Sequence, residues 1–143
     1  NAAFSDMAKK ELALITQAVN EILEITVDAF SKDDNEAAKA IEPLEETIDD
    51  MIMMLKDRHT KRLKNGQCSI ASGLVFMEAL TYFERASDQC SSIAVMMLAR
   101  HNEQILQNHY EYLREIHAGN DVAYLAEKDR RREQYIKPLK QIF

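Results

Sequence analysis

Apolar residues recur at helical spacing along most of this chain, and that periodicity restricts the fold more than any other feature. Three successive segments of about 30 residues each carry one apolar stripe with a period near 3.6 residues. The 143 residues include only 3 glycines and 2 prolines, too few for the turns of a β-rich domain. The pattern therefore predicts an all-α fold whose long helices bury their stripes in a shared core.

Start and stop signals place the expected helices. Ser5 is a suitable N-cap, and Asn65-Gly66 is a suitable helix end. Pro43 lies inside the second helix and predicts a kink or short break near residues 39–42, because it lacks a backbone donor. We expect one domain over residues 4–136, an antiparallel three-helix bundle with additional C-terminal helices. The expected helices span residues 4–31, 35–64, 69–101, 102–118 and 121–136.

The charge of the chain restricts its partners. With 24 acidic against 18 basic residues the net charge is −6, so the surface repels phosphate backbones and no nucleic-acid partner is expected. One basic run, KDRRR at residues 128–132, is the exception. A solvated helix face is the favoured interpretation of this run, and binding to anionic lipid or an acidic partner is the alternative.

Carboxylates four residues apart are the candidate chemical groups. Seven such pairs occur, and we compared each with the apolar stripe of its own helix at about 100° per residue. Three pairs lie away from the stripes and should be solvated: Glu24/Asp28, Glu46/Asp50 and Glu111/Glu115. Two pairs, on two different helices, are directed toward the core: Glu45/Asp49 and Glu84/Asp88.

Two explanations of the core-directed pairs stay open, because ionised carboxylates in a core cost several kcal/mol unless they are paired or bound to a cation. Lys, Arg or water could satisfy them. Alternatively, Glu45, Asp49, Glu84 and Asp88 converge on a metal ion such as iron, manganese, zinc or magnesium. Roughly 17 residues separate Asp49 from the turn at Gly66, and roughly 18 separate the turn from Glu84, so antiparallel helices would place both pairs at one height.

Common catalytic motifs are missing from the sequence. It contains no glycine-rich phosphate loop, HExxH motif or serine nucleophile elbow, so we do not expect an enzyme. A ferritin-like carboxylate metalloenzyme would need Glu-x-x-His motifs, whereas the nearest Glu and His residues here are two positions apart. His101, His109 and His117 recur every eight residues, a spacing that drifts around a helix and predicts no metal-binding stripe. His59 is expected to be a capped or half-buried histidine rather than a metal ligand.

Two stretches resemble a known family. Residues 83–94 (FERASDQCSSIA) resemble the ERxxDxxxxIA signature of PhoU-type helical domains, and residues 44–49 (LEETID) resemble the ExxID stretch of the preceding helix. The resemblance implies a three-helix bundle whose ExxxD motifs, here Glu45/Asp49 and Glu84/Asp88, bind metal ions, often as iron clusters. The chain has Ser87, Gln89 and Ser92 where the family often has Gly, His and Asn, which argues against a multinuclear cluster.

The resemblance also implies a function. Residues 112–135 resemble the tail that follows the PhoU-like domain of bacterial sodium/phosphate cotransporters. We therefore expect a regulatory domain on the cytoplasmic side of the cell membrane, with the transmembrane portion of the same transporter as its partner. The alternative is a free-standing PhoU-like adaptor that regulates phosphate uptake signalling.

Apolar residues on the back of the 69–101 helix suggest a further contact. Either a second copy of the chain, forming a homodimer, or the C-terminal helices should cover this face. Its members are Val75, Tyr82, Ile93, Met96 and Met97.

Overall fold

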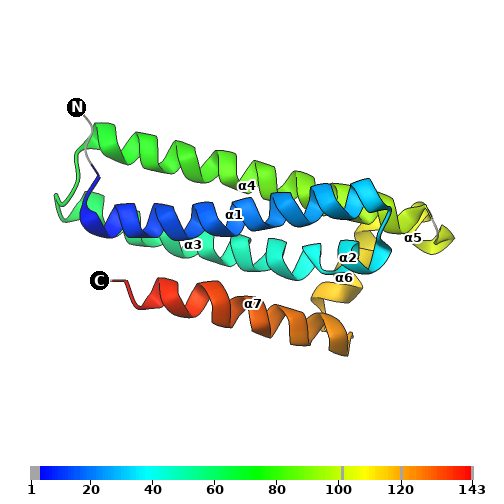
Figure 1. Ribbon diagram of the computed structural model, residues 1–143. Helices are drawn as coiled ribbons and strands as arrows, with labels where there is room; N and C mark the ends of the chain where they lie inside the picture. The colour runs from blue at the N-terminus through cyan, green and yellow to red at the C-terminus, as the bar shows by residue number, and fades with distance from the viewer. Residues whose placement is uncertain (1–3, 101, 120, 143) are drawn as a thin grey trace.

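The computed structural model describes residues 4–100, 102–119 and 121–142, and Figure 1 shows its helices. Every regular element within these ranges is an α-helix, which confirms the predicted fold class. In chain order the helices are α1 (Asp6–Lys32), α2 (Asn35–Lys39), α3 (Ile41–Lys64), α4 (Ile70–Ala99), α5 (Glu103–Gln107), α6 (His109–His117) and α7 (Val122–Lys140).

Helices α1, α3 and α4 form the body of the molecule, and each packs against the other two. Figure 1 shows that α3 runs opposite to both α1 and α4. Each fully buried aliphatic or aromatic side chain stabilises such a bundle by about 1.5–3 kcal/mol relative to an exposed one. The fully buried side chains at the centre include Ile15, Ile22, Ile48, Leu55, Phe76 and Leu80.

Local sequence signals account for most helix ends. The Ser5 hydroxyl caps α1 by accepting a hydrogen bond from the Ala8 amide at 3.1 Å, as predicted. The predicted break near Pro43 occurs at Ala40, which separates α2 from α3. Pro43 then lies in the first turn of α3, where an amide donor would have no partner within the helix.

The C-terminal region differs from the prediction in two respects. The helix expected over residues 102–118 is divided into α5 and α6, because the Asn108 side chain caps a new helix by accepting from the Glu111 amide at 3.0 Å. Helix α7 continues past the expected end at Ile136 to Lys140, since Leu139 is fully buried in the core. The expected boundary at His101 and the break at Asn120 fall outside the described residues.

Helix α7 lies along the outer side of α3 and also contacts α1 (Figure 1). Part of the basic run at its centre binds the bundle, so the predicted solvated face is wrong for Lys128, Arg131 and Arg132, whereas Asp129 and Arg130 are exposed. Arg131, which is only 3% exposed, contacts Glu21 of α1 at 2.5 Å. Arg132 contacts Asp50 of α3 at 2.5 Å, and Lys128 contacts Glu46 of α3 at 3.3 Å. Ion pairs with acids of α1 and α3 therefore attach α7.

Replacing Arg131 by Gln is expected to loosen α7 from the bundle. The change leaves Glu21 without its buried guanidinium partner, and we expect a cost of about 2 kcal/mol in local stability. Hydrogen exchange of the α7 amides should then become about 30-fold faster. Arg130→Gln is the matched control, because Arg130 lies on the same helix but is exposed and, among the described residues, forms its ion pair with Glu127 alone. Equal acceleration in both variants would show that the buried pair does not hold α7.

The back of α4 is not covered by the C-terminal helices. Val75, Tyr82 and Met96 are 49%, 57% and 62% exposed, whereas Met97 is buried in the core. Helix α7 packs against α3 and α1 instead, so the prediction that C-terminal helices cover this face is wrong. In the part of the chain that the structure describes, no helix has the length and apolarity to cross a bilayer.

Candidate metal centre

Three of the four predicted carboxylates meet between α3 and α4. One oxygen each of Glu45, Asp49 and Asp88 lies within 4.8 Å of the other two. The four-residue spacing on α3 places Glu45 and Asp49 on one face, and the antiparallel α4 brings Asp88 to the same height. Glu45 is buried, Asp49 is half-buried and Asp88 is exposed, so the cluster opens from the core to solvent.

The fourth predicted carboxylate, Glu84, belongs to a different interaction. Its carboxylate contacts the Lys56 ammonium at 3.4 Å, and its side chain is 42% exposed. Glu84 therefore corresponds to the alternative explanation, in which a lysine of the neighbouring helix satisfies the acid. It still contributes negative charge at the cluster, because Glu84 and Asp88 both raise the pKa of Asp49, after burial as the main cause.

The electrostatics of the cluster favour neutralisation. Burial, a hydrogen bond with Asp49 and the charge of Glu42 together raise the pKa of Glu45 from 4.5 to about 11. Burial also raises the pKa of Asp49. Adjacent carboxylates with raised pKa values share protons when no cation is present. The site therefore holds a proton at neutral pH or accepts a positive ion in its place.

The stability of the metal-free chain should fall as pH rises. The pKa of Glu45 is higher in the folded chain, about 11, than its unfolded value of 4.5. The protonated form therefore contributes its full stability below pH 4.5 and loses it as pH rises toward 11. We expect the free energy of unfolding to fall by on the order of 1 kcal/mol per pH unit between about pH 5 and 9.

Urea unfolding with a chelator present measures this slope. Glu45→Gln carries no charge at any of these pH values, so its stability should depend less on pH and should exceed that of the unaltered chain at about pH 9. A slope that Glu45→Gln leaves unchanged would show that another group is responsible.

Two further residues at this site were missed by the sequence analysis. Glu42, one turn before Glu45, is only 6% exposed and accepts a hydrogen bond from the Ser91 hydroxyl of α4 at 2.5 Å. His117 of α6 reaches the other Glu42 oxygen at 2.8 Å. The spacing of Glu42 and Glu46 is visible in the sequence. The contact of His117 with Glu42 could not be predicted from the spacing of the histidines, because the turn between α6 and α7 places His117.

The prediction of a solvated side chain is wrong for Glu46, whereas the Asp50 side chain is 42% exposed as well as paired. The Glu46 side chain is only 16% exposed and lies 3.3 Å from Lys128 and 3.5 Å from His117. Asp50 is paired with Arg132. These two acids do lie opposite the apolar stripe of α3, as expected for α3 alone. Helix α7, however, packs on that side of α3. Glu24, Asp28 and Glu115, by contrast, are exposed as expected.

His59 does not belong to the carboxylate cluster, as expected, but it is buried in the core rather than capped or half-buried. It is 1% exposed and stacks on Phe76, with 4.3 Å between the ring centroids. Burial and the neighbouring Arg62 lower its pKa, so the ring is neutral.

The donor set at Glu45, Asp49 and Asp88 fits a hard cation. All three ligands are carboxylates, which suit magnesium, manganese and iron better than zinc, for which nitrogen and sulfur donors are usual. A bound cation would replace the shared protons and offset the repulsion between the acids. Because its ligands belong to two helices, it would also link α3 to α4.

Comparison with known proteins shows the family of the chain. The model of the PhoU domain family matches residues 12–97, which run from α1 to the end of α4 and include the three clustered carboxylates. No curated protein and no solved structure matches the chain. Helices α5, α6 and α7, with His117 and the basic run, lie outside the matched residues.

Proposed function

The chain belongs to the PhoU family, and on that basis we propose that it is the cytoplasmic regulatory domain of a sodium-dependent phosphate cotransporter. PhoU domains are associated with the regulation of phosphate transport. The domain would respond to a cation held by Glu45, Asp49 and Asp88, and would transmit the response to the transmembrane portion of the same protein through helix packing.

The observation that carries the regulatory role is the carboxylate cluster. Glu45 and Asp49 belong to α3, and Asp88 belongs to α4. Binding of a cation at this site would therefore change the force between these two core helices. Without a cation the acids repel each other or share protons. With a cation they attract a common centre. A change of this kind can alter helix packing at a distance, since both helices run through the whole core.

The C-terminal tail supports the transporter assignment. Residues 112–135 resemble the tail of the cotransporter domains, and here α7 packs back onto α3. The second candidate is a free-standing adaptor. The exposed apolar side chains on the back of α4, such as Tyr82 and Met96, favour it because an adaptor needs a surface for its partner.

Two experiments test the proposal. Reading the coding sequence upstream of Asn1 should reveal several transmembrane segments, and a reading frame without them would favour the adaptor. Phosphate uptake should then be measured in cells that carry the whole protein with Glu45→Gln and Asp49→Asn. We expect uptake to lose its dependence on external phosphate, whereas a control with Glu24→Gln and Asp28→Asn should keep it. Unchanged regulation in the first variant would contradict a regulatory role for the site.

A further inference from the structure

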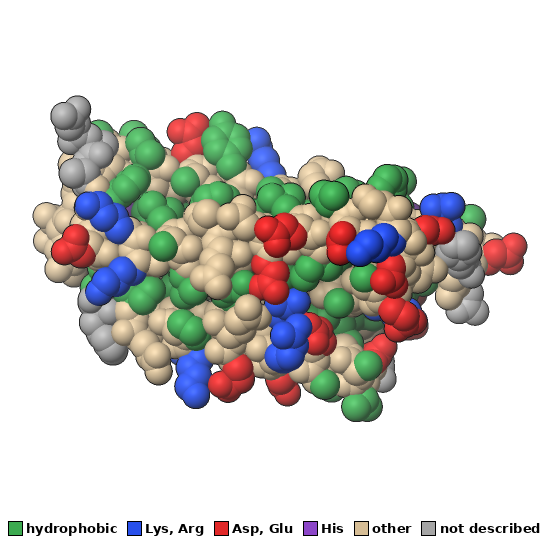
Figure 2. Space-filling model, in the orientation of Figure 1, with side chains coloured by type: hydrophobic (Ala, Val, Ile, Leu, Met, Phe, Trp, Pro, Cys, Tyr) green, Lys and Arg blue, Asp and Glu red, His purple; other side chains and the backbone are tan. Residues whose placement is uncertain are grey.

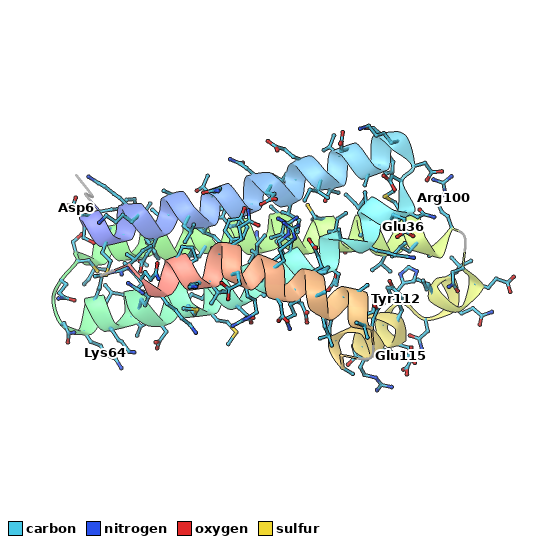
Figure 3. All side chains as sticks on the ribbon, turned by 60° about the horizontal axis from the view of Figure 1, so that its bottom comes forward. Asp6, Glu36, Lys64, Arg100, Tyr112 and Glu115 are labelled. Atoms are coloured by element: carbon cyan, nitrogen blue, oxygen red, sulfur yellow. The ribbon has the colours of Figure 1, made fainter. Side chains whose placement is uncertain are left out.

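A separate cavity lies between α2 and the α6–α7 region at one end of the molecule. Its volume is about 730 Å³, and residues of α2, α3, α4, α6 and α7 line it, together with the residues around α5. Figure 3 labels Glu36 of α2 and Tyr112 and Glu115 of α6 at this end. The clustered carboxylates Glu45, Asp49 and Asp88 do not line the cavity. A volume of this size is within the range of small-molecule sites.

The lining of the cavity is negatively charged. Its ionisable members include the acids Glu36, Glu115, Asp121 and Glu127, against one base, Lys39. Lys39 pairs with Glu36 at 3.1 Å, and Glu127 is held by two arginines of α7. Among the described residues Glu115 and Asp121 make no ion pair. Figure 2 shows acidic side chains concentrated at this end of the molecule.

Two buried polar atoms beside the cavity lack hydrogen-bond partners. Tyr124 is only 6% exposed, and its hydroxyl group makes no hydrogen bond within the described part of the chain. The side-chain oxygen of Asn35 is also buried and unpaired there. Unsatisfied buried groups cost about 1–3 kcal/mol each, so both atoms favour an arrangement in which a ligand donates to them.

The walls of the cavity combine aromatic and aliphatic surface. Tyr112 and Tyr124 contribute ring surface, and Leu98 and Ile105, each 7% exposed, contribute apolar surface. Burial, followed by the charges of Glu42 and Asp121, raises the pKa of Tyr112. The carboxylates therefore impose a negative potential on the ring. A negative potential over aromatic rings attracts positively charged groups.

We propose that this cavity binds an organic cation, namely an ammonium or guanidinium group carried on an apolar chain. The carboxylates of Glu115 and Asp121, which make no ion pair among the described residues, attract its charge, and the Tyr112 and Tyr124 rings pack against its chain. The ammonium or guanidinium hydrogens supply the donors that the unpaired oxygens lack. An anion such as phosphate is excluded by the same carboxylates. The cation could belong to a free polyamine or to a Lys or Arg side chain of a protein segment.

Calorimetric titration of the whole chain distinguishes these sources. The probes are spermidine, a short lysine- and arginine-rich peptide, the neutral chain 1,8-octanediol and inorganic phosphate. We expect spermidine or the peptide to bind at one site per chain, and the two neutral or anionic probes to give no heat of binding. The test variant is Glu115→Gln with Asp121→Asn, in which Asn still caps α7. The control is Glu24→Gln with Asp28→Asn, which removes the same charge from exposed positions on α1.

The proposal predicts that the test variant weakens binding about tenfold and that the control changes it less than about twofold. Equal weakening of probe binding in both variants would show non-specific attraction to an acidic surface and would contradict the proposed binding site. Failure of both cationic probes to bind, or binding of phosphate in their place, would also overturn it. Glu45→Gln should not affect binding, so this result is independent of the proposed metal centre.

Discussion

Manganese(II) at a hundred times its dissociation constant should raise the midpoint of thermal unfolding of this chain by about 5–10 °C. A ligand at that excess stabilises the folded state by about 2.7 kcal/mol, and each kcal/mol raises the midpoint by about 2–4 °C at this size. The gain arises because the ion replaces repulsion among Glu45, Asp49 and Asp88 with attraction to one centre. Iron(II) and magnesium should act in the same direction, and zinc less, because the donors are all oxygen.

Three variants test which carboxylates bind the metal ion. Glu45→Gln with Asp49→Asn should abolish the shift, whereas Glu24→Gln with Asp28→Asn should keep it. Glu84→Gln should keep most of it, since the Glu84 carboxylate contacts Lys56 and lies outside the group of three. A metal that shifts all four proteins equally would bind elsewhere, and no shift in any of them would exclude the site.

Replacing Glu11 by Gln should destabilise the fold by about 3–5 kcal/mol, the largest effect that we expect from a single substitution. The Glu11 carboxylate is fully buried and contacts Arg58 Nε at 2.6 Å and Arg62 Nη2 at 2.7 Å. The Arg62 side chain is only 6% exposed, so the substitution leaves a positive charge buried without its partner. Arg58 also donates to the carbonyl oxygen of Leu139 at 3.2 Å, so the same cluster ties α1 and α3 to the end of α7.

Urea unfolding monitored by circular dichroism measures this cost. Asp28→Asn is the control, because Asp28 forms an exposed ion pair with Lys32 that should contribute less than about 1 kcal/mol. Removing the charges together, with Glu11→Leu, Arg58→Met and Arg62→Met, should recover much of the lost stability, since no unpaired charge remains. A Glu11→Gln variant that loses less than about 1 kcal/mol would show that water reaches the cluster.

Local patterns in the sequence were sufficient for the helices and for part of the metal centre. The apolar period, the cap at Ser5 and the break before Pro43 depend on residues within one or two turns, and the structure has all three features. Roughly equal arm lengths on either side of the turn at Gly66 likewise place Glu45 level with Asp88 and Asp49 level with Glu84, and the structure brings Glu45, Asp49 and Asp88 together. That argument needs only the rise per residue of a helix.

The partners of the charged side chains that pair across helices were decided by the tertiary structure. A helix considered alone has one apolar side and one solvated side, and on that basis Glu46 and Asp50 faced water. Packing of α7 onto α3 turned that solvated side into an interface, and it brought Arg132 and His117 to acids some 70–80 residues earlier in the chain. The direction in which α7 returns depends on the turns on either side of α6. The sequence by itself therefore determined which residues form helices and which carboxylates share a height. Only the packed bundle determined which of those carboxylates are paired with a base and which remain available for a cation.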